Sequence, residues 1–130
     1  MGTNVHRSTL DFFQAKMLTH SRVRRCEQLR VPDDFVFVVE RTDNLSTVRV
    51  HLADAYSYGL PDYAGRPKQI RKGDFILIAR PEATFDESLI ERARKDGIGI
   101  GKLAKFMGAL NVSNMETYKS PEERRALGLT

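Results

Sequence analysis

Hydrophobic and polar positions form their clearest pattern between residues 73 and 103, where two apolar runs flank an amphipathic segment. Residues 75–79 (FILIA) are apolar over the length of a strand, which should end before Pro81 because proline has no amide hydrogen to donate. Residues 98–101 (IGIG) form a second run, typical of a short buried strand whose glycines allow close backbone approach. The pattern predicts a βαβ unit with two parallel neighbouring strands and a right-handed crossover.

The segment between these two strands is predicted to be a helix. Leu89, Ile90 and Ala93 recur at helical spacing, and we expect this stripe to face the core together with the preceding strand. Residues 84–87 (TFDE) have the sequence of a capping box, so the helix should begin there. Gly97 can adopt the left-handed conformation that commonly ends a helix.

One helix and two strands are predicted before this unit. Apolar positions between residues 9 and 29 are mostly three or four apart, which predicts a long helix after a loose leader at residues 1–7. Residues 35–40 are nearly all apolar, as in a strand covered on both faces. Residues 47–56 begin with alternating apolar and polar side chains, which predicts a second strand. A short polar turn separates the two strands, so they should form an antiparallel hairpin.

Two more helices are predicted near the end of the chain. Apolar positions in residues 102–111 follow a helical stripe, and residues 112–130 should form a linker and a short helix with Pro121 at its first position. The predicted order is helix, strand, strand, long connection, strand, helix, strand, helix. We therefore expect one α/β domain, residues 1–130, with a mixed sheet flanked by helices. A small β-barrel is the alternative fold, and the helix pattern at 86–96 argues against it.

Composition narrows the class of protein. No run approaches the length of a membrane span, and the N-terminal residues lack the apolar region of a signal peptide. The single cysteine, Cys26, excludes an intramolecular disulfide and fits a reducing cytoplasm. The chain carries 21 basic and 17 acidic side chains, a mild excess that favours an anionic partner. We expect a cytoplasmic protein without a membrane partner, for which a protein partner or a second copy is also possible.

Residues 57–72 (SYGLPDYAGRPKQIRK) form the longest region without a periodic signal. Connections of this length inside a small domain are often functional. Basic residues interleaved with aromatic ones suit nucleic acid, because rings stack on bases while cations contact phosphates. The predicted nucleic-acid-binding residues are Arg66, Lys68, Arg71, Lys72, Tyr58 and Tyr63. The alternative is an ordinary surface crossover, in which the tyrosines pack on the sheet and the cations are merely solvated.

Three segments resemble the PD-(D/E)xK superfamily, the restriction-endonuclease-like nucleases. Residues 32–36 (PDDFV) are similar to the segment that carries the first metal-binding aspartate of that family. Residues 48–59 (VRVHLADAYSYG) occupy the place of the (D/E)xK strand, and residues 75–101 resemble the strand, helix and short GIG strand that follow. The resemblance covers residues 32–103. It implies a restriction-endonuclease-like fold, with Asp34 and Asp54 as catalytic carboxylates that share Mg²⁺ or Mn²⁺ and His51 as a third ligand.

The catalytic motif of that family is not intact in this sequence. The family needs two carboxylates for a divalent metal and a lysine that orients or activates the attacking water. No Asp-x-Lys or Glu-x-Lys occurs, and the corresponding triplet is 51–53 (HLA) or 52–54 (LAD). A lysine would have to come from elsewhere in the chain. The candidates are Lys68, Lys72 and Lys102.

Three functions therefore stay open. The expected one is a nucleic-acid-binding or assembly module that keeps a degenerate nuclease-like fold, does not cleave and needs no cofactor. The second is an active endonuclease for DNA or RNA with a rearranged site, which would require Mg²⁺ or Mn²⁺. The third is an α/β protein-interaction module unrelated to nucleic acid.

Overall fold

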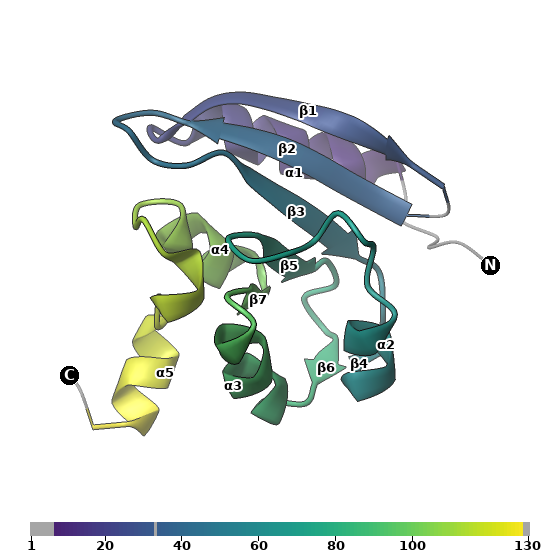
Figure 1. The fold of residues 1–130 in the computed structure, drawn as a ribbon, viewed down its shortest axis with the longest axis vertical. Coiled ribbons are helices and arrows are strands. Elements are labelled where there is room, and N and C mark those ends of the chain that lie inside the picture. The colour runs from purple at the N-terminus through teal and green to yellow at the C-terminus, as the bar shows by residue number, and fades with distance from the viewer. Residues whose placement is uncertain (1–6, 33, 129–130) are drawn as a thin grey trace.

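Five strands form one mixed sheet at the centre of the fold, and helices cover both of its faces (Figure 1). The computed structural model of the protein describes residues 7–32 and 34–128. Its elements in chain order are α1 (Arg7–Thr19), β1 (Val23–Val31), β2 (Asp34–Arg41), β3 (Val48–Ala53), β4 (Ser57–Tyr58), α2 (Leu60–Ala64), β5 (Phe75–Ile78), β6 (Thr84–Phe85), α3 (Ser88–Lys95), β7 (Gly99–Gly101), α4 (Leu103–Ala109), the 3₁₀ turn η1 (Met115–Thr117) and α5 (Pro121–Ala126). The described residues form a single small α/β domain, which confirms the predicted fold class at this level.

The strand order of the central sheet is β1-β2-β3-β5-β7. β1, β2 and β3 are antiparallel neighbours, whereas β3, β5 and β7 run parallel. The predicted hairpin is therefore confirmed as β2 and β3, and the predicted parallel strands as β5 and β7. β4 and β6 pair separately as a short parallel sheet. The sheet formed by the described residues is open, with β1 and β7 at its edges, so the β-barrel alternative is wrong.

The long helix predicted between residues 9 and 29 is wrong in its second half. α1 ends at Thr19, and β1 follows as a strand paired with β2. The apolar residues Val23, Cys26 and Leu29 have helical spacing for two reasons: a bulge between Val23 and Arg25 puts Val23 and Cys26 on one face of β1, and Leu29 lies on the other face. Val23 and Cys26 pack against one core cluster, and Leu29 packs against the other. The predicted leader lies outside the described residues except for its last residue, which begins α1.

Two apolar clusters, one on each face of the sheet, make up the core. The first lies between the sheet and helices α1 and α4, and includes the rings of Phe13, Phe37, Phe75 and Phe106, which pack against one another at tilted angles. The second lies under α2 and α3, and includes Val36, Tyr58, Tyr63, Ile76, Ile78, Leu89, Ala93 and Ile100. β2 contributes to both clusters, so its prediction as a strand covered on both faces is confirmed.

The start of α3 differs from the capping-box prediction. Thr84 and Phe85 form β6 instead, and the Thr84 amide donates to the carbonyl of Tyr56 at 2.9 Å. The helix begins at Ser88, whose amide donates to the Asp86 carboxylate at 3.0 Å. Its end follows the prediction, because Gly97 has a φ of +76°.

The close backbone approach predicted for the glycines of β7 is confirmed. A Cβ atom at Gly99 would lie 2.5 Å from a ring carbon of Phe75, so no other residue fits there without displacing the core. At the other end of the chain α5 has the predicted start, with a capping box between Ser120 and Glu123 and proline at its first position. Among residues 7–32 and 34–128 no helix has the length and apolar character needed to cross a membrane.

Candidate functional site

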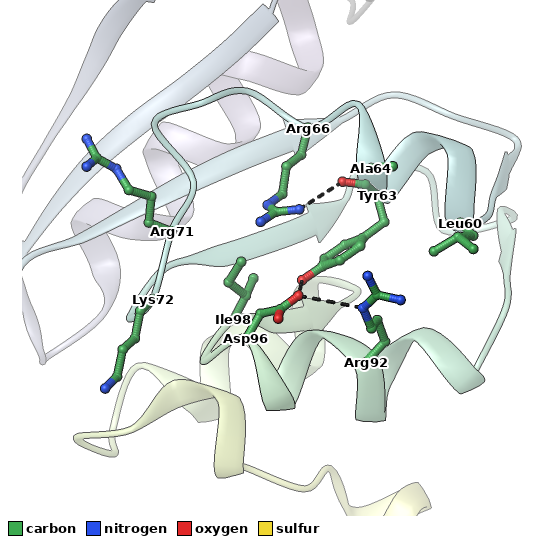
Figure 2. A pocket seen from close by; sticks show the side chains of 9 residues that line it. All are labelled: Leu60, Tyr63, Ala64, Arg66, Arg71, Lys72, Arg92, Asp96 and Ile98. Atoms are coloured by element: carbon green, nitrogen blue, oxygen red, sulfur yellow. Dashed lines mark hydrogen bonds and ion pairs between the residues drawn. The ribbon is translucent and has the colours of Figure 1, made fainter.

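The predicted basic connection contains a short helix, α2, and borders a cavity of about 380 Å³. The cavity lies between α2, the segment before β5 and the C-terminal half of α3 (Figure 2). Its charged lining residues are Arg66, Arg71, Lys72, Arg92 and Asp96. The structure thus brings three of the four predicted cations together and adds one arginine from α3. Lys68 is exposed on the same connection outside the lining.

A hydrogen-bonded group occupies one side of this cavity (Figure 2). The Tyr63 hydroxyl donates to the Asp96 carboxylate at 2.6 Å, and the Arg92 Nε lies 3.8 Å from the same carboxylate. The Arg66 guanidinium lies 4.5 Å from the Tyr63 ring centroid and donates to the carbonyls of Tyr63 and Ile70. Arg66 is therefore engaged within the protein, whereas the Arg92 side chain is 58 % exposed and makes the longer contact.

Arg71 and Lys72 are placed differently. Both side chains are exposed, and both point away from the Tyr63–Asp96 pair (Figure 2). Within the described parts of the chain no side-chain hydrogen bond or ion pair involves Arg71, Lys72 or Lys68. These three cations of the connection are consequently accessible to an anionic ligand.

The two predicted tyrosines are core residues. Tyr58 is 2 % exposed and Tyr63 is 1 % exposed, so neither ring is presented to a ligand as the stacking interpretation requires. Burial, with a smaller contribution from the hydrogen bond to Asp96, raises the pKa of Tyr63 to about 12. Burial also raises the pKa of Tyr58, whose hydroxyl has no hydrogen-bond partner among the described residues. The alternative interpretation, tyrosines packed on the sheet, matches their positions.

Asp34 and His51, two residues assigned to a metal site, do come together. Asp34 begins β2, and the antiparallel register that pairs Val36 with His51 brings the two side chains to one face of the sheet. The Asp34 Oδ1 and His51 Nε2 atoms are 2.7 Å apart. Burial lowers the pKa of His51, and the neighbouring Asp34 carboxylate partly opposes this effect.

Asp54, the third predicted ligand, has a different partner. Its carboxylate follows the end of β3 and accepts from Arg80 Nη2 at 3.3 Å across the end of β5. In the described residues no three His, Cys, Asp or Glu side chains gather as a candidate metal site, so Asp34, His51 and Asp54 are not assembled into one. Ala53, two residues after His51, is buried in the second core cluster.

Arg92 and Asp96 are functional candidates that the sequence prediction missed. Their spacing of four residues places them on one face of α3, but only the tertiary structure shows that this face borders α2. Tyr56 was not among the predicted nucleic-acid-binding residues, and the structure shows that it is 67 % exposed. Its distinguishing feature, the guanidinium of Arg80 over its ring, joins residues far apart in the sequence.

Comparisons with known proteins do not assign this chain to a family. No protein-family model matches the chain, and no significant match is found among curated proteins or solved structures. The function is therefore inferred from the arrangement of the residues described above.

Proposed function

We propose that this chain is a nucleic-acid-binding domain that has a nuclease-like arrangement of elements but does not cleave its ligand. The observation that carries the proposal is the group of accessible cations beside the cavity, Lys68, Arg71 and Lys72. Three positive side chains lie within five residues of one exposed connection, and contacts of such cations with phosphate groups dominate the affinity of nucleic-acid-binding proteins.

The surrounding charges support an anionic ligand at this place. Asp96, the acid that lines the cavity, accepts from Tyr63 and lies 3.8 Å from Arg92, so its negative charge is partly offset by these neighbours. Arg66 remains on the same wall and adds positive potential. The net charge of +4 over the whole chain favours the approach of a polyanion.

Replacing Lys68, Arg71 and Lys72 together by alanine should weaken binding to a labelled oligonucleotide and flatten its salt dependence. Each phosphate contact that is lost removes about 0.7–0.9 from the slope of log K against log salt, so the slope should fall by roughly two to three units. Fluorescence anisotropy titrations at several salt concentrations measure both quantities. Arg66 stays unchanged, because it supports the Tyr63 backbone.

A matched variant separates local contacts from the effect of total charge. Arg7, Lys16, Arg124 and Arg125 are exposed cations on α1 and α5. Replacing three of them, Lys16, Arg124 and Arg125, by alanine changes the net charge equally and should leave the salt slope nearly as in the parent. Equal slopes for both triple variants and the parent would contradict the proposed site. Absence of any salt-dependent binding by the parent would favour the protein-interaction module instead.

The proposal also predicts that the purified protein does not cut nucleic acid. In the two registers that the resemblance allows, the place of the family's lysine falls on Ala53 or on Asp54, and Asp54 is engaged by Arg80. Plasmid DNA, linear DNA and RNA incubated with the protein and Mg²⁺ or Mn²⁺ should remain intact on a gel. Cutting that is abolished by Asp34→Ala would instead establish the endonuclease with a rearranged site.

A further inference from the structure

Tyr56 is an exposed aromatic residue held in a fixed position. It lies between the end of β3 and the start of β4, and its carbonyl accepts from the Thr84 amide at 2.9 Å. This backbone bond continues the pairing of β4 with β6, so the main chain at Tyr56 belongs to a small sheet. The ring itself is outside the core, and the residue is 67 % exposed.

One face of this ring is already occupied by a cation. The Arg80 guanidinium lies 4.0 Å from the ring centroid, within the range of a cation–π contact. Asp54 holds the guanidinium through an ion pair, and the Asp54 side chain is only 7 % exposed. A buried carboxylate, an arginine and an aromatic ring therefore form one contact chain, Asp54–Arg80–Tyr56, at the ends of the parallel strands β3 and β5.

We infer that Tyr56 receives an unpaired base of single-stranded nucleic acid on the ring face opposite Arg80. This inference rests on the proposed function and names the form of its ligand. Every base has an aromatic face that can stack on such a ring, and a ring fixed in advance loses little conformational entropy on binding. Bases inside a duplex are covered by their neighbours, so the site discriminates against double-stranded nucleic acid.

The charges around Arg80 and Tyr56 indicate that the ligand group bound on Tyr56 is a base rather than a phosphate. Arg80 is balanced by Asp54 and lies 3.7 Å from the exposed carboxylate of Glu82. Phosphates are expected instead at Arg71 and Lys72, on the connection that begins beside Tyr56. Tyr56 stands four residues before Leu60, which lines the basic cavity, so both contacts belong to one continuous segment of the chain.

The test compares Tyr56→Ala, Tyr56→Phe and the parent in anisotropy titrations at one salt concentration, with single-stranded and duplex oligonucleotides of equal length. The alanine variant should lose about fivefold to 150-fold in affinity for the single strand, as expected for one stacked base. Its affinity for duplex should not change. The phenylalanine variant keeps an aromatic face and should bind the single strand nearly as the parent does.

Phe12→Ala provides the matched control, because Phe12 is an aromatic residue on α1 that is 53 % exposed. It should bind both oligonucleotides like the parent, and all variants should keep the parent's thermal midpoint. Unchanged single-strand binding by Tyr56→Ala, or equal losses for single strand and duplex, overturns this inference and leaves the proposed function standing. Absence of binding to either oligonucleotide by the parent overturns both.

Discussion

Replacing Leu89 by alanine should lower the free energy of unfolding by about 2–5 kcal/mol, the range for a large aliphatic side chain deleted from a core. Leu89 is 2 % exposed and lies on the face of α3 that packs against the sheet. Its neighbours in the second core cluster include Ile76 and Ile100 from adjacent parallel strands. These side chains cannot collapse into the space without moving the strands, so a cavity should remain.

Urea denaturation followed by circular dichroism measures this loss. Leu127→Ala is the matched control, because Leu127 is 59 % exposed on the short C-terminal turn and the same truncation there removes few contacts. The control should change the stability by no more than about 0.5 kcal/mol. A loss below about 1 kcal/mol for Leu89→Ala would mean that α3 does not cover the sheet as described.

The elements that could be predicted from the sequence are those whose conformation is determined by residues close to them in the chain. β5 is a continuous apolar run, and Gly97 stops the helix that precedes β7. The turn between β2 and β3 contains Asp43 and Asn44, both with the positive φ that these residue types tolerate best among non-glycine residues. In each case the sequence within a few residues determines the local conformation.

The parts that could not be predicted depend on partners distant in sequence. The segment 23–31 has helix-like spacing, but its backbone pairs with β2 along the whole segment except at the bulge between Val23 and Arg25. Thr84 has the sequence context of a helix cap, but pairing with Ser57 draws it into β6. A pattern read along the chain contains no information about such competing partners.

The candidate site shows the same division. The accessibility of Arg71 and Lys72 could be predicted from their residue type, because long charged side chains are seldom buried. The burial of Tyr58 and the exposure of Tyr56 could not, because strand alternation would place residues two apart on the same face, whereas Tyr56 precedes β4 and Tyr58 lies in it. Likewise, only the tertiary structure shows that Asp54 faces Arg80 and not Asp34.

One charged residue has a role that neither its sequence context nor the proposed function suggests. Arg41, at the end of β2, is 4 % exposed, and burial lowers the pKa of its guanidinium. It donates to the carbonyls of Leu110 at 3.1 Å and Val112 at 2.7 Å, just after α4, and to Ser46 at 2.8 Å in the β2–β3 turn. Through these bonds Arg41 joins the hairpin to the C-terminal end of α4.

Arg41→Met should therefore lower the free energy of unfolding by about 2 kcal/mol or more. Methionine retains much of the apolar volume, but each buried carbonyl left without a donor costs about 1–3 kcal/mol, and Leu110 and Val112 both lose theirs. Arg49→Met is the control, because Arg49 is exposed on β3 and its guanidinium has no hydrogen bond or ion pair within the described residues. Equal denaturation midpoints for the two variants would show that Arg41 is not needed to hold α4 against the hairpin.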